Sequence, residues 1–329
     1  MNKKPKILVV GSFMMDLIAS APRVPNLGET VIGTSFQTAG GGKGINQAVQ
    51  CARLGADVTM AGCVGNDSFG KEMTDIARSA GVDISHVKVS NKSSSGVGNI
   101  QLQVTGSDVQ NRIIVIPGAN YDLEVEDLNW LPDEIRNFDM VMLQLELRME
   151  ITEYVVKVAA EAGVPVMLNP APAAELSDEI LSNVTYLSPN EFEAALLTDS
   201  SILAVYEGVD EDALIKVTSI IRNKGVKKVI VTLGSNGSAL ADDDGIQRIE
   251  PVKMDDVKDP TAAGDSFVAA FCFAVTSGFS EADALRFASY TAAITVTRMG
   301  AMPSLPNINE VLDLMKERGC TDINANLFN

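Results

Sequence analysis

Histidine is almost missing from this sequence, since His86 is the only one. A metal site built from several histidines is therefore excluded, and any histidine-based catalytic triad would depend on that single residue. Basic residues are also scarce: 26 Lys and Arg stand against 43 Asp and Glu, which gives a net charge of −17. Nucleic acids and anionic membrane surfaces attract concentrated positive charge, so we expect neither as a partner.

Cysteines and long apolar runs are few as well. The four cysteines are widely spaced and form no C-x-x-C pair, which indicates reduced thiols in a cytoplasmic protein. The longest mostly apolar stretch, 267–275, has about half the length of a membrane span. The apolar run at 7–10 is too short for a signal peptide. We therefore expect a cytoplasmic protein without a membrane-spanning segment.

The chain is 46% hydrophobic and alternates short apolar runs with longer helical segments. Strands are predicted at 6–10, 58–64, 139–145, 164–169, 184–189 and 227–234. Helices are predicted at 46–56, 69–81, 149–162, 210–224, 264–277, 281–298 and 308–318. Buried strands separated by helices are typical of a parallel sheet covered on both faces. We therefore predict a single doubly wound α/β domain over residues 1–329.

Two stretches, 17–38 and 95–116, are strand-like but carry no helical pattern of their own. The second contains apolar segments on either side of 105–110, as in a hairpin. Ordinary edge strands would explain both stretches. The sharper interpretation joins them in a small antiparallel sheet that projects from the main domain as a lid over a cleft.

The segment GGGKGINQA, at 40–48, brings glycines to the start of a predicted helix. Glycine lets backbone N–H groups approach an anion or a polyhydroxy ligand, although such a run can also be a plain flexible turn. It is not a Walker A loop, because Gln37 stands where that motif has its first glycine and Gly44 where it has Ser or Thr.

The segment DPTAAGDSF, at 259–267, leads through small residues into an apolar helix. The N–H groups of 262–265 at that helix start can form an anion hole, assisted by the helix dipole. The simple explanation of Asp265 is a helix cap, and the functional alternative is a general base beside a phosphate site. With one histidine in the chain, a carboxylate is the expected base.

Several residues follow predicted strands at their carboxyl ends, where open α/β sheets bind ligands. Asp16, Glu146 and Asn190 hold such places, and Gly234 ends a strand. Each polar residue alone has an ordinary explanation as a turn residue, a surface charge or a helix cap. Together they indicate one shared cleft.

In their order along nearly the whole chain, these motifs resemble the ribokinase family, part of the broader ribokinase and phosphofructokinase-B carbohydrate kinases. The matching segments are GSFMMD (11–16), PNLGET (25–30), GGKGINQA (41–48), GNDSFG (65–70), PGAN (117–120), QLE (144–146), NPAPA (169–173), SPNE (188–191), TLGSNG (232–237), AAGDSF (262–267) and TAAITVTRMGAMPS (291–304). The resemblance implies an ATP-dependent kinase for the 5-hydroxyl of D-ribose. A kinase for 2-deoxyribose, another sugar or a nucleoside stays open, and so does a nonenzymatic sugar-binding regulator.

The resemblance also implies roles for individual residues. Asp265 takes the proton from the primary hydroxyl of the sugar, and Ala262, Ala263 and Gly264 form the anion hole. Lys43 also approaches the transferred phosphate. The residues implied in sugar binding are Met14, Asp16, Gly42, Lys43, Gly44, Asn46, Glu146 and Asp265.

On the nucleotide side, the resemblance implies ATP, Mg²⁺ and a monovalent cation, K⁺. The residues implied in nucleotide binding are Asn190, Glu193, Thr232, Gly234, Gly237 and Gly264, of which Asn190 and Glu193 order Mg²⁺ through water. The loops implied to hold K⁺, mostly through backbone carbonyls, contain Asp259, Thr261, Thr295, Arg298, Gly300 and Ser304. Backbone N–H groups, Lys43 and these cations would reconcile a chain of charge −17 with a polyanionic cosubstrate. A homodimer through the lid is implied as well.

The chain departs from the family pattern at several places. Pro260 replaces the usual Thr or Ser, removes an N–H and stiffens the cation loop. Met14 replaces an Asn that touches the sugar, and because Met donates no hydrogen bond we hypothesise that 2-deoxy-D-ribose is accepted comparatively well. Asn99 and Gln101, on predicted lid strands, are more polar than the pattern expects and leave room for a different sugar.

Overall fold

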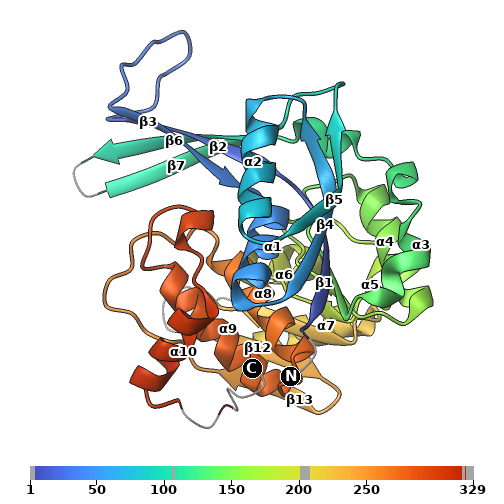
Figure 1. Cartoon of the computed structure of the whole chain (residues 1–329). Coiled ribbons are helices and arrows are strands. Elements are labelled where there is room, and N and C mark those ends of the chain that lie inside the picture. The colour runs from blue at the N-terminus through green and yellow to red at the C-terminus, as the bar shows by residue number, and fades with distance from the viewer. Residues whose placement is uncertain (1–3, 106–107, 201–207, 321–322, 324–329) are drawn as a thin grey trace.

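The computed structural model describes residues 4–105, 108–200, 208–320 and 323. Nine strands in these ranges form one large sheet at the centre of the molecule (Figure 1). They are β1 (Lys6–Val10), β4 (Asp57–Gly65), β5 (Asp83–Ser90), β8 (Met140–Leu143), β9 (Val166–Leu168), β10 (Tyr186–Leu187), β11 (Lys228–Thr232), β12 (Ser238–Asp242) and β13 (Gly245–Ile249).

The order of strands in this sheet is β13-β12-β11-β10-β9-β8-β1-β4-β5. All neighbours from β11 to β5 run parallel. The hairpin of β12 and β13 extends the sheet by two antiparallel strands at one edge. The predicted doubly wound, mostly parallel α/β fold is confirmed.

Helices cover both faces of this sheet. One face carries α1 (Lys43–Leu54), α2 (Ser68–Ser79), α8 (Ala263–Thr276), α9 (Glu281–Thr295) and α10 (Ile308–Glu317). The other carries α3 (Leu131–Glu134), α4 (Met149–Ala162), α5 (Asp178–Asn183), α6 (Glu191–Thr198) and α7 (Glu211–Asn223). Short 3₁₀ turns connect these elements: η1 (Gly118–Asp122), η2 (Val125–Leu128), η3 (Ile135–Asn137), η4 (Gly234–Asn236) and η5 (Met302–Ser304).

The apolar run of β1 shows why a parallel strand of this kind is continuous in sequence. Ile7 and Val9 lie in the core under α1 and α8, whereas Leu8 and Val10 lie in the core under α4. All four side chains are fully buried. Because successive side chains point to opposite faces, a strand covered on both sides needs an apolar residue at every position.

A second, smaller sheet projects from the main domain (Figure 1). Its strands, in the order β3-β2-β6-β7, are β2 (Met14–Ala21), β3 (Ser35–Gly41), β6 (Gly96–Thr105) and β7 (Asp108–Ile116). The β2–β3 and β6–β7 pairs are antiparallel, as predicted, whereas β2 and β6 run parallel. The predicted hairpin is β6–β7, and its tip at 106–107 lies outside the described residues.

The two sheets meet where β1 ends. The chain passes from β1 to β2 through residues 11–13, and β3 is followed almost directly by α1. The start of α1 therefore lies between the small sheet and the carboxyl edge of the large one. This junction is where the expected site residues gather.

Candidate functional site

The start of α1 packs tightly against the end of β1. Gly42, with φ of 100°, precedes this helix, which has no capping side chain. The N–H of Lys43 donates to Glu146 Oε2 (2.8 Å), and that of Gly44 donates to Ser12 Oγ (3.3 Å). The Ser12 hydroxyl in turn donates to Glu146. The amides of Lys43 and Gly44 are therefore occupied within the protein, so ligand contacts at this turn fall to Gly42 and to side chains.

Lys43 lies in the combined field of three carboxylates. Burial disfavours its charge, but Asp265, Glu146 and Glu193 together raise the pKa of Lys43. Within the described part of the chain its ammonium forms no ion pair. The carboxylates keep the ammonium of Lys43 charged without forming an ion pair with it, so this charge is available to an anionic ligand.

The pKa values of the acidic side chains at this junction are shifted as well. Burial, assisted by the nearby Glu146, raises the pKa of Asp16 to about 6. Burial also raises the pKa values of Glu146 and Glu193, although hydrogen bonds and Lys43 oppose the effect. Perturbed carboxylates in one junction are a common mark of a functional site.

Asp16 is held between the two strands that flank β2. A Cβ on Gly98, in β6, would lie 2.4 Å from Asp16 Oδ1, and one on Gly41, in β3, would lie 2.8 Å from Oδ2. Both positions therefore require glycine as long as the carboxylate keeps this place. Asp16 pairs in register with Gly98, so its side chain shares the face of β6 to which Gly98 belongs.

The same register bears on one expectation from the sequence. Asn99 pairs with Leu17 and Gln101 pairs with Ala19, whereas Asp16 is the residue directly before Leu17 in β2. Because side chains alternate along a strand, Asn99 and Gln101 belong to the face opposite Asp16. Because Asp16 is the expected sugar ligand, this register does not support the interpretation that Asn99 and Gln101 influence the choice of sugar.

Asp265 is buried at the start of α8, with 6% of its surface exposed. Its Oδ2 accepts from Asn46 Nδ2 (2.9 Å) and its Oδ1 accepts from Gln47 Nε2 (3.1 Å). Residue 262 stands at the cap position of α8, and no side chain caps the helix there. The explanation of Asp265 as a helix cap is therefore wrong, since its carboxylate binds two amides of α1.

The backbone at the start of α8 forms an open turn. Ala262 adopts the left-handed conformation, with φ of 61°, and the first intrahelical bond runs from Ser266 N to its carbonyl (2.8 Å). The N–H of Ala263 donates to the Pro260 carbonyl (3.1 Å). A Cβ on Gly264 would meet nothing within 4 Å. The expected anion hole therefore has fewer free donors than the four amides of 262–265, because the amide of Ala263 already donates to Pro260.

A second group of expected residues lies at the ends of β10 and β11. Asn190 and Glu193 form a reciprocal capping box at α6, in which both oxygens of Glu193 accept from Asn190 (2.8 and 3.0 Å). The simple explanation of Asn190 as a cap is confirmed. Thr232 forms an isolated parallel bridge with Asn190. The turn after it closes through Gly237, whose N–H donates to the Gly234 carbonyl (3.2 Å).

The two expected cation loops are joined by one carboxylate. Asp259 accepts from the N–H groups of Thr261 (2.9 Å) and Gly300 (2.8 Å). Partial burial opposes ionisation, but these hydrogen bonds lower the pKa of Asp259. Thr295 donates to Ser266 Oγ (3.0 Å), which places this loop pair next to the start of α8.

Other side chains of the expected cation site point elsewhere. Arg298 forms an ion pair with Glu310 (2.5 Å), and the Ser304 hydroxyl donates to the Ala301 carbonyl (2.6 Å). Only backbone carbonyls of these residues remain for a cation. In the described ranges, no three His, Cys, Asp or Glu side chains are grouped as a metal site.

Four buried polar residues of the site carry no role in the sequence analysis. Ser12 joins the start of α1 to Glu146, and Gln47 joins α1 to Asp265. Gln144 and Asn169 contact Gln47 from the ends of β8 and β9. All four lie inside the motif segments, but only the folded structure shows what they contact.

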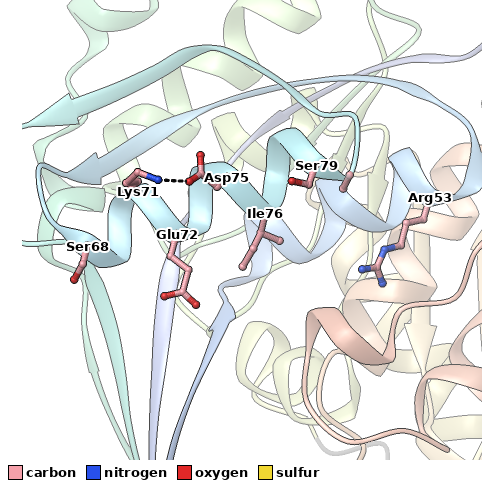
Figure 2. A pocket seen from close by; sticks show the side chains of 8 residues that line it. Arg53, Ser68, Lys71, Glu72, Asp75, Ile76 and Ser79 are labelled. Atoms are coloured by element: carbon pink, nitrogen blue, oxygen red, sulfur yellow. Dashed lines mark hydrogen bonds and ion pairs between the residues drawn. The ribbon is translucent and has the colours of Figure 1, made fainter.

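Two pockets lie outside these contacts. One, of about 750 Å³, runs along α2 towards Arg53 (Figure 2). Lys71 binds Asp75 (2.6 Å) and Arg53 donates to the carbonyls of Met302 and Leu305 (both 2.7 Å), while the carboxylate of Glu72 also lines the pocket. No expected site residue lines it.

The other pocket, of about 450 Å³, lies where the segment after β13 faces α9. Its lining includes four basic residues, Arg248, Lys253, Arg286 and Arg318. Arg248 also donates to the carbonyl of Asn236 (2.9 Å), in the turn between Gly234 and Gly237. Two of these charges are balanced, since Arg248 binds Glu211 (2.5 Å) and Arg286 binds Asp283 (3.4 Å), and Glu250 also lines the pocket.

Comparison with known proteins agrees with this geometry. The chain is 39% identical to the ribokinase of Schizosaccharomyces pombe over 313 residues, which are 93% of this chain and 96% of that one. It is 38% identical to the ribokinase of Bacillus subtilis, over 94% and 99% of the two chains. The structure of Arabidopsis thaliana ribokinase complexed with ribose and ATP superposes with a TM-score of 0.87, at 34% identity over 95% and 99%.

The family model described as "pfkB family carbohydrate kinase" matches residues 4–308. The match spans both sheets and the two helix starts that carry Lys43 and Asp265. The chain therefore belongs to the pfkB family of carbohydrate kinases.

Proposed function

We propose that this protein transfers the γ-phosphoryl group of ATP to the 5-hydroxyl of D-ribose. The observation that supports this most is Asp265, a buried carboxylate held by Asn46 at an open helix start and close enough to Lys43 to raise its pKa. A base, a cation and an amide cradle in one junction suit phosphoryl transfer to an alcohol. The similar proteins named ribokinases support ribose as the sugar.

At the sugar end, Asp16, Asn46 and Glu146 supply acceptors and donors for hydroxyl groups. Gly42 gives backbone access, and Met14, which is buried, supplies an apolar contact. Glu146 already receives the Lys43 amide and the Ser12 hydroxyl, so its remaining lone pairs meet the sugar or water. Gly44 contributes by its close packing on Ser12 and not through its amide.

At the nucleotide end, the amides of Ala262, Gly264 and Asp265 are the donors left in the proposed anion hole. Ala262 shapes the turn, and the amide of Ala263 supports it through Pro260. Such donors, together with the helix dipole, favour negative charge as it develops on the phosphoryl oxygens. Thr232, Gly234 and Gly237 form the adjoining wall for the nucleotide.

Asp265 then accepts the proton of the 5-hydroxyl while the oxygen moves in line towards phosphorus. Lys43 stabilises the negative charge from the side of α1. Positioning supplies much of the rate, because both substrates are held at rigid element ends.

The residues around Asn190 fit a magnesium ion that is held indirectly. Both carboxylate oxygens of Glu193 are used in the capping box, so contact through water suits them better than direct ligation. When bound with ATP, Mg²⁺ neutralises phosphate charge. Asn190 and Glu193 would order its water shell.

The loops at 259–261 and 295–304 fit a potassium ion held by oxygen donors. Asp259 keeps the loops together, and Thr261, Thr295, Arg298, Gly300 and Ser304 offer carbonyl oxygens. Pro260 contributes its own carbonyl to the Ala263 amide, so this loop keeps a defined shape despite the missing N–H. Replacing K⁺ by tetramethylammonium should lower kcat, and an unchanged rate would contradict the cation site.

We also propose that residues 1–329 act as one domain whose small sheet is a lid, formed by about 17–38 and 95–116. Both faces of β7 are apolar and exposed: Ile113 is 52% and Ile114 is 60% exposed. Ile113 shares the face of Asp16, whereas Ile114 lies on the opposite face with Asn99. The first face covers the sugar, and the second joins two subunits in a homodimer.

Two neighbouring variants test this division. Ile114→Asp should convert a dimer into monomers in sedimentation analysis, and Ile113→Asp should leave the dimer intact but raise the KM for ribose. Monomeric wild-type protein would contradict the dimer. The four cysteines form no disulfide within the described residues, which suits the cytoplasm that we propose as the location.

A coupled assay of ADP formation tests the function itself. We expect ribose to give the highest kcat/KM in a panel with 2-deoxyribose, fructose and adenosine, with ribose 5-phosphate as the product. The similar ribokinases do not favour the alternative of a deoxyribose kinase, despite Met14. ADP formation that no sugar stimulates would contradict the kinase and favour a regulator.

A further inference from the structure

A set of buried amide side chains lies behind Asp265. Gln47, on α1, is fully buried, and its Nε2 donates to Asp265 Oδ1 (3.1 Å) and to Asn169 Oδ1 (3.4 Å). Its Oε1 accepts from Gln144 Nε2 (2.5 Å). Both hydrogens of the amide nitrogen and the carbonyl oxygen are thus engaged, which fixes the orientation of this side chain.

The partners of Gln47 are attached to the large sheet. Gln144 follows β8 and Asn169 follows β9, and Asn169 Nδ2 donates to the carbonyl of Ser188 after β10 (2.8 Å). Three neighbouring strand ends therefore hold one amide network. Networks of buried hydrogen bonds restrict the geometry of their members, and here every polar atom of Gln47 is engaged although Gln144 Oε1 has no partner among the described residues.

Gln47 differs in one respect from its neighbour Asn46. Asn46 holds the other oxygen of Asp265, but it is also an expected sugar ligand. Gln47 is fully buried, and its contacts within the described residues are all to other protein side chains. Any effect of Gln47 on the reaction must therefore pass through Asp265 or through the packing of α1.

We propose that Gln47 is a positioning residue for Asp265. This role rests on the function proposed above. By holding Oδ1, it sets the plane of the carboxylate so that the oxygen on the cleft side faces the sugar hydroxyl. The strand ends behind Gln47 transmit the rigidity of the sheet to the base. The chemistry itself stays with Asp265.

The variant Gln47→Met removes these hydrogen bonds at similar volume. Gln50→Met is its matched control: Gln50 is also fully buried on α1, and its Nε2 donates to the Pro306 carbonyl (2.9 Å), away from Asp265. We expect kcat to fall roughly 10- to 100-fold in Gln47→Met, because a misplacement of about 1 Å has such an effect. The KM values for ribose and ATP should change less than about threefold in both variants, and Gln50→Met should keep kcat.

A double-mutant cycle separates positioning from packing. If Gln47 acts through Asp265, adding Gln47→Met to Asp265→Asn should cause little further loss of kcat. Losses that multiply in the double variant would overturn the proposal. An equal fall of kcat in Gln47→Met and Gln50→Met would also overturn it, because packing of α1 would then explain both.

Crystal structures of the two variants give a readout that needs no substrate. The Asp265 carboxylate should rotate in Gln47→Met and keep its place in Gln50→Met. An unmoved carboxylate in Gln47→Met would overturn the inference even if the enzyme is a ribokinase. Wild-type protein that does not phosphorylate ribose would instead contradict the proposed function, and the rotation would still decide the role of Gln47.

Discussion

Two helices, α1 and α8, begin at the same junction without a capping side chain, yet their starts are built in opposite ways. At α1, a Cβ on Gly44 would lie 2.3 Å from the backbone nitrogen of Ser12. At α8, a Cβ on Gly264 would meet no atom of the described residues within 4 Å. Gly44 is required by the close packing of α1 on the Ser12 segment, whereas Gly264 leaves space beside the start of α8.

The hydrogen bonds follow the same division. The first N–H groups of α1 donate hydrogen bonds to Glu146 and Ser12, so the protein itself satisfies the donors at the start of this helix. Of the amides at 262–265, only that of Ala263 donates in this way to another described residue. Glycine-rich sequence at a helix start therefore does not by itself indicate an anion site. The open start at α8 is the better candidate, and α1 contributes side chains.

The largest expected effect concerns the side chain at the open start. Asp265→Asn should lower kcat roughly 10²–10⁴-fold, because the base is lost while the amides and Lys43 remain. Sugar binding should be retained, since the amide keeps the size of the carboxyl group and can still pair with Asn46. Steady-state kinetics with ribose checks this, and near-normal turnover would refute Asp265 as the base.

A pair of glycine substitutions should separate the two helix starts. Gly44→Ala should lower the free energy of unfolding by roughly 1–3 kcal/mol, because the new methyl group collides with backbone of the Ser12 segment. Gly264→Ala should not destabilise the fold, since alanine favours helix. It should nevertheless lower kcat about tenfold or more, because the methyl group enters the space proposed for phosphate.

Urea unfolding and kinetics of both glycine variants provide the measurement. The comparison fails if Gly264→Ala is the less stable of the two. It also fails if Gly264→Ala is as active as the wild type, because the space at α8 would then have no use.

Much of the fold follows from local sequence. Helix α4 occupies the predicted residues 149–162, and Asn190 caps its helix, because periodicity and caps are local signals. Strands β5, β12 and β13 are not predicted, and β5 and β13 share one reason. Their sequences, DISHVKVS and GIQRI, mix polar and apolar residues because these strands are only partly buried.

The site is less predictable, because its contacts join distant parts of the chain. The sequence indicates Asp265 as a functional residue, but not that Asn46 and Gln47, more than 200 residues earlier, hold both of its oxygens. The faces of Asn99 and Gln101 depend on a parallel pairing of β2 with β6 that no local pattern specifies. Register and long-range hydrogen bonds decide these points.

The pH dependence of sugar binding offers a test on the α1 side. Burial and Glu146 raise the pKa of Asp16 to about 6. Below that pH the carboxyl group gains a proton and becomes a poorer acceptor, so the KM for ribose should rise by up to about tenfold per pH unit. The raised pKa of Asp16 also affects the stability of the unliganded protein. Its contribution to the free energy of unfolding rises as pH falls from 6 towards 4, because the folded protein then binds more protons than the unfolded chain.

Asp16→Asn should remove the rise of KM below pH 6 while raising KM at neutral pH. The kinetic profile of ribose, measured with saturating ATP, checks this. A KM that rises below pH 6 as steeply in Asp16→Asn as in the wild type would assign the titration to another group, such as Glu146.

The smallest expected effect concerns Ser12, which satisfies the start of α1. Ser12→Ala removes a donor to Glu146 and an acceptor for the Gly44 amide, so the free energy of unfolding should fall by roughly 1–3 kcal/mol. Ser238→Ala is the control, because this hydroxyl is equally buried but has no hydrogen-bond partner among the described residues, and its loss should change stability little. The kcat of Ser12→Ala should stay near that of the wild type, since the amides it frees belong to the protein-occupied helix start. A large loss of kcat at unchanged stability would mean that α1 also presents its amides to the substrate, and the contrast between the two helix starts would disappear.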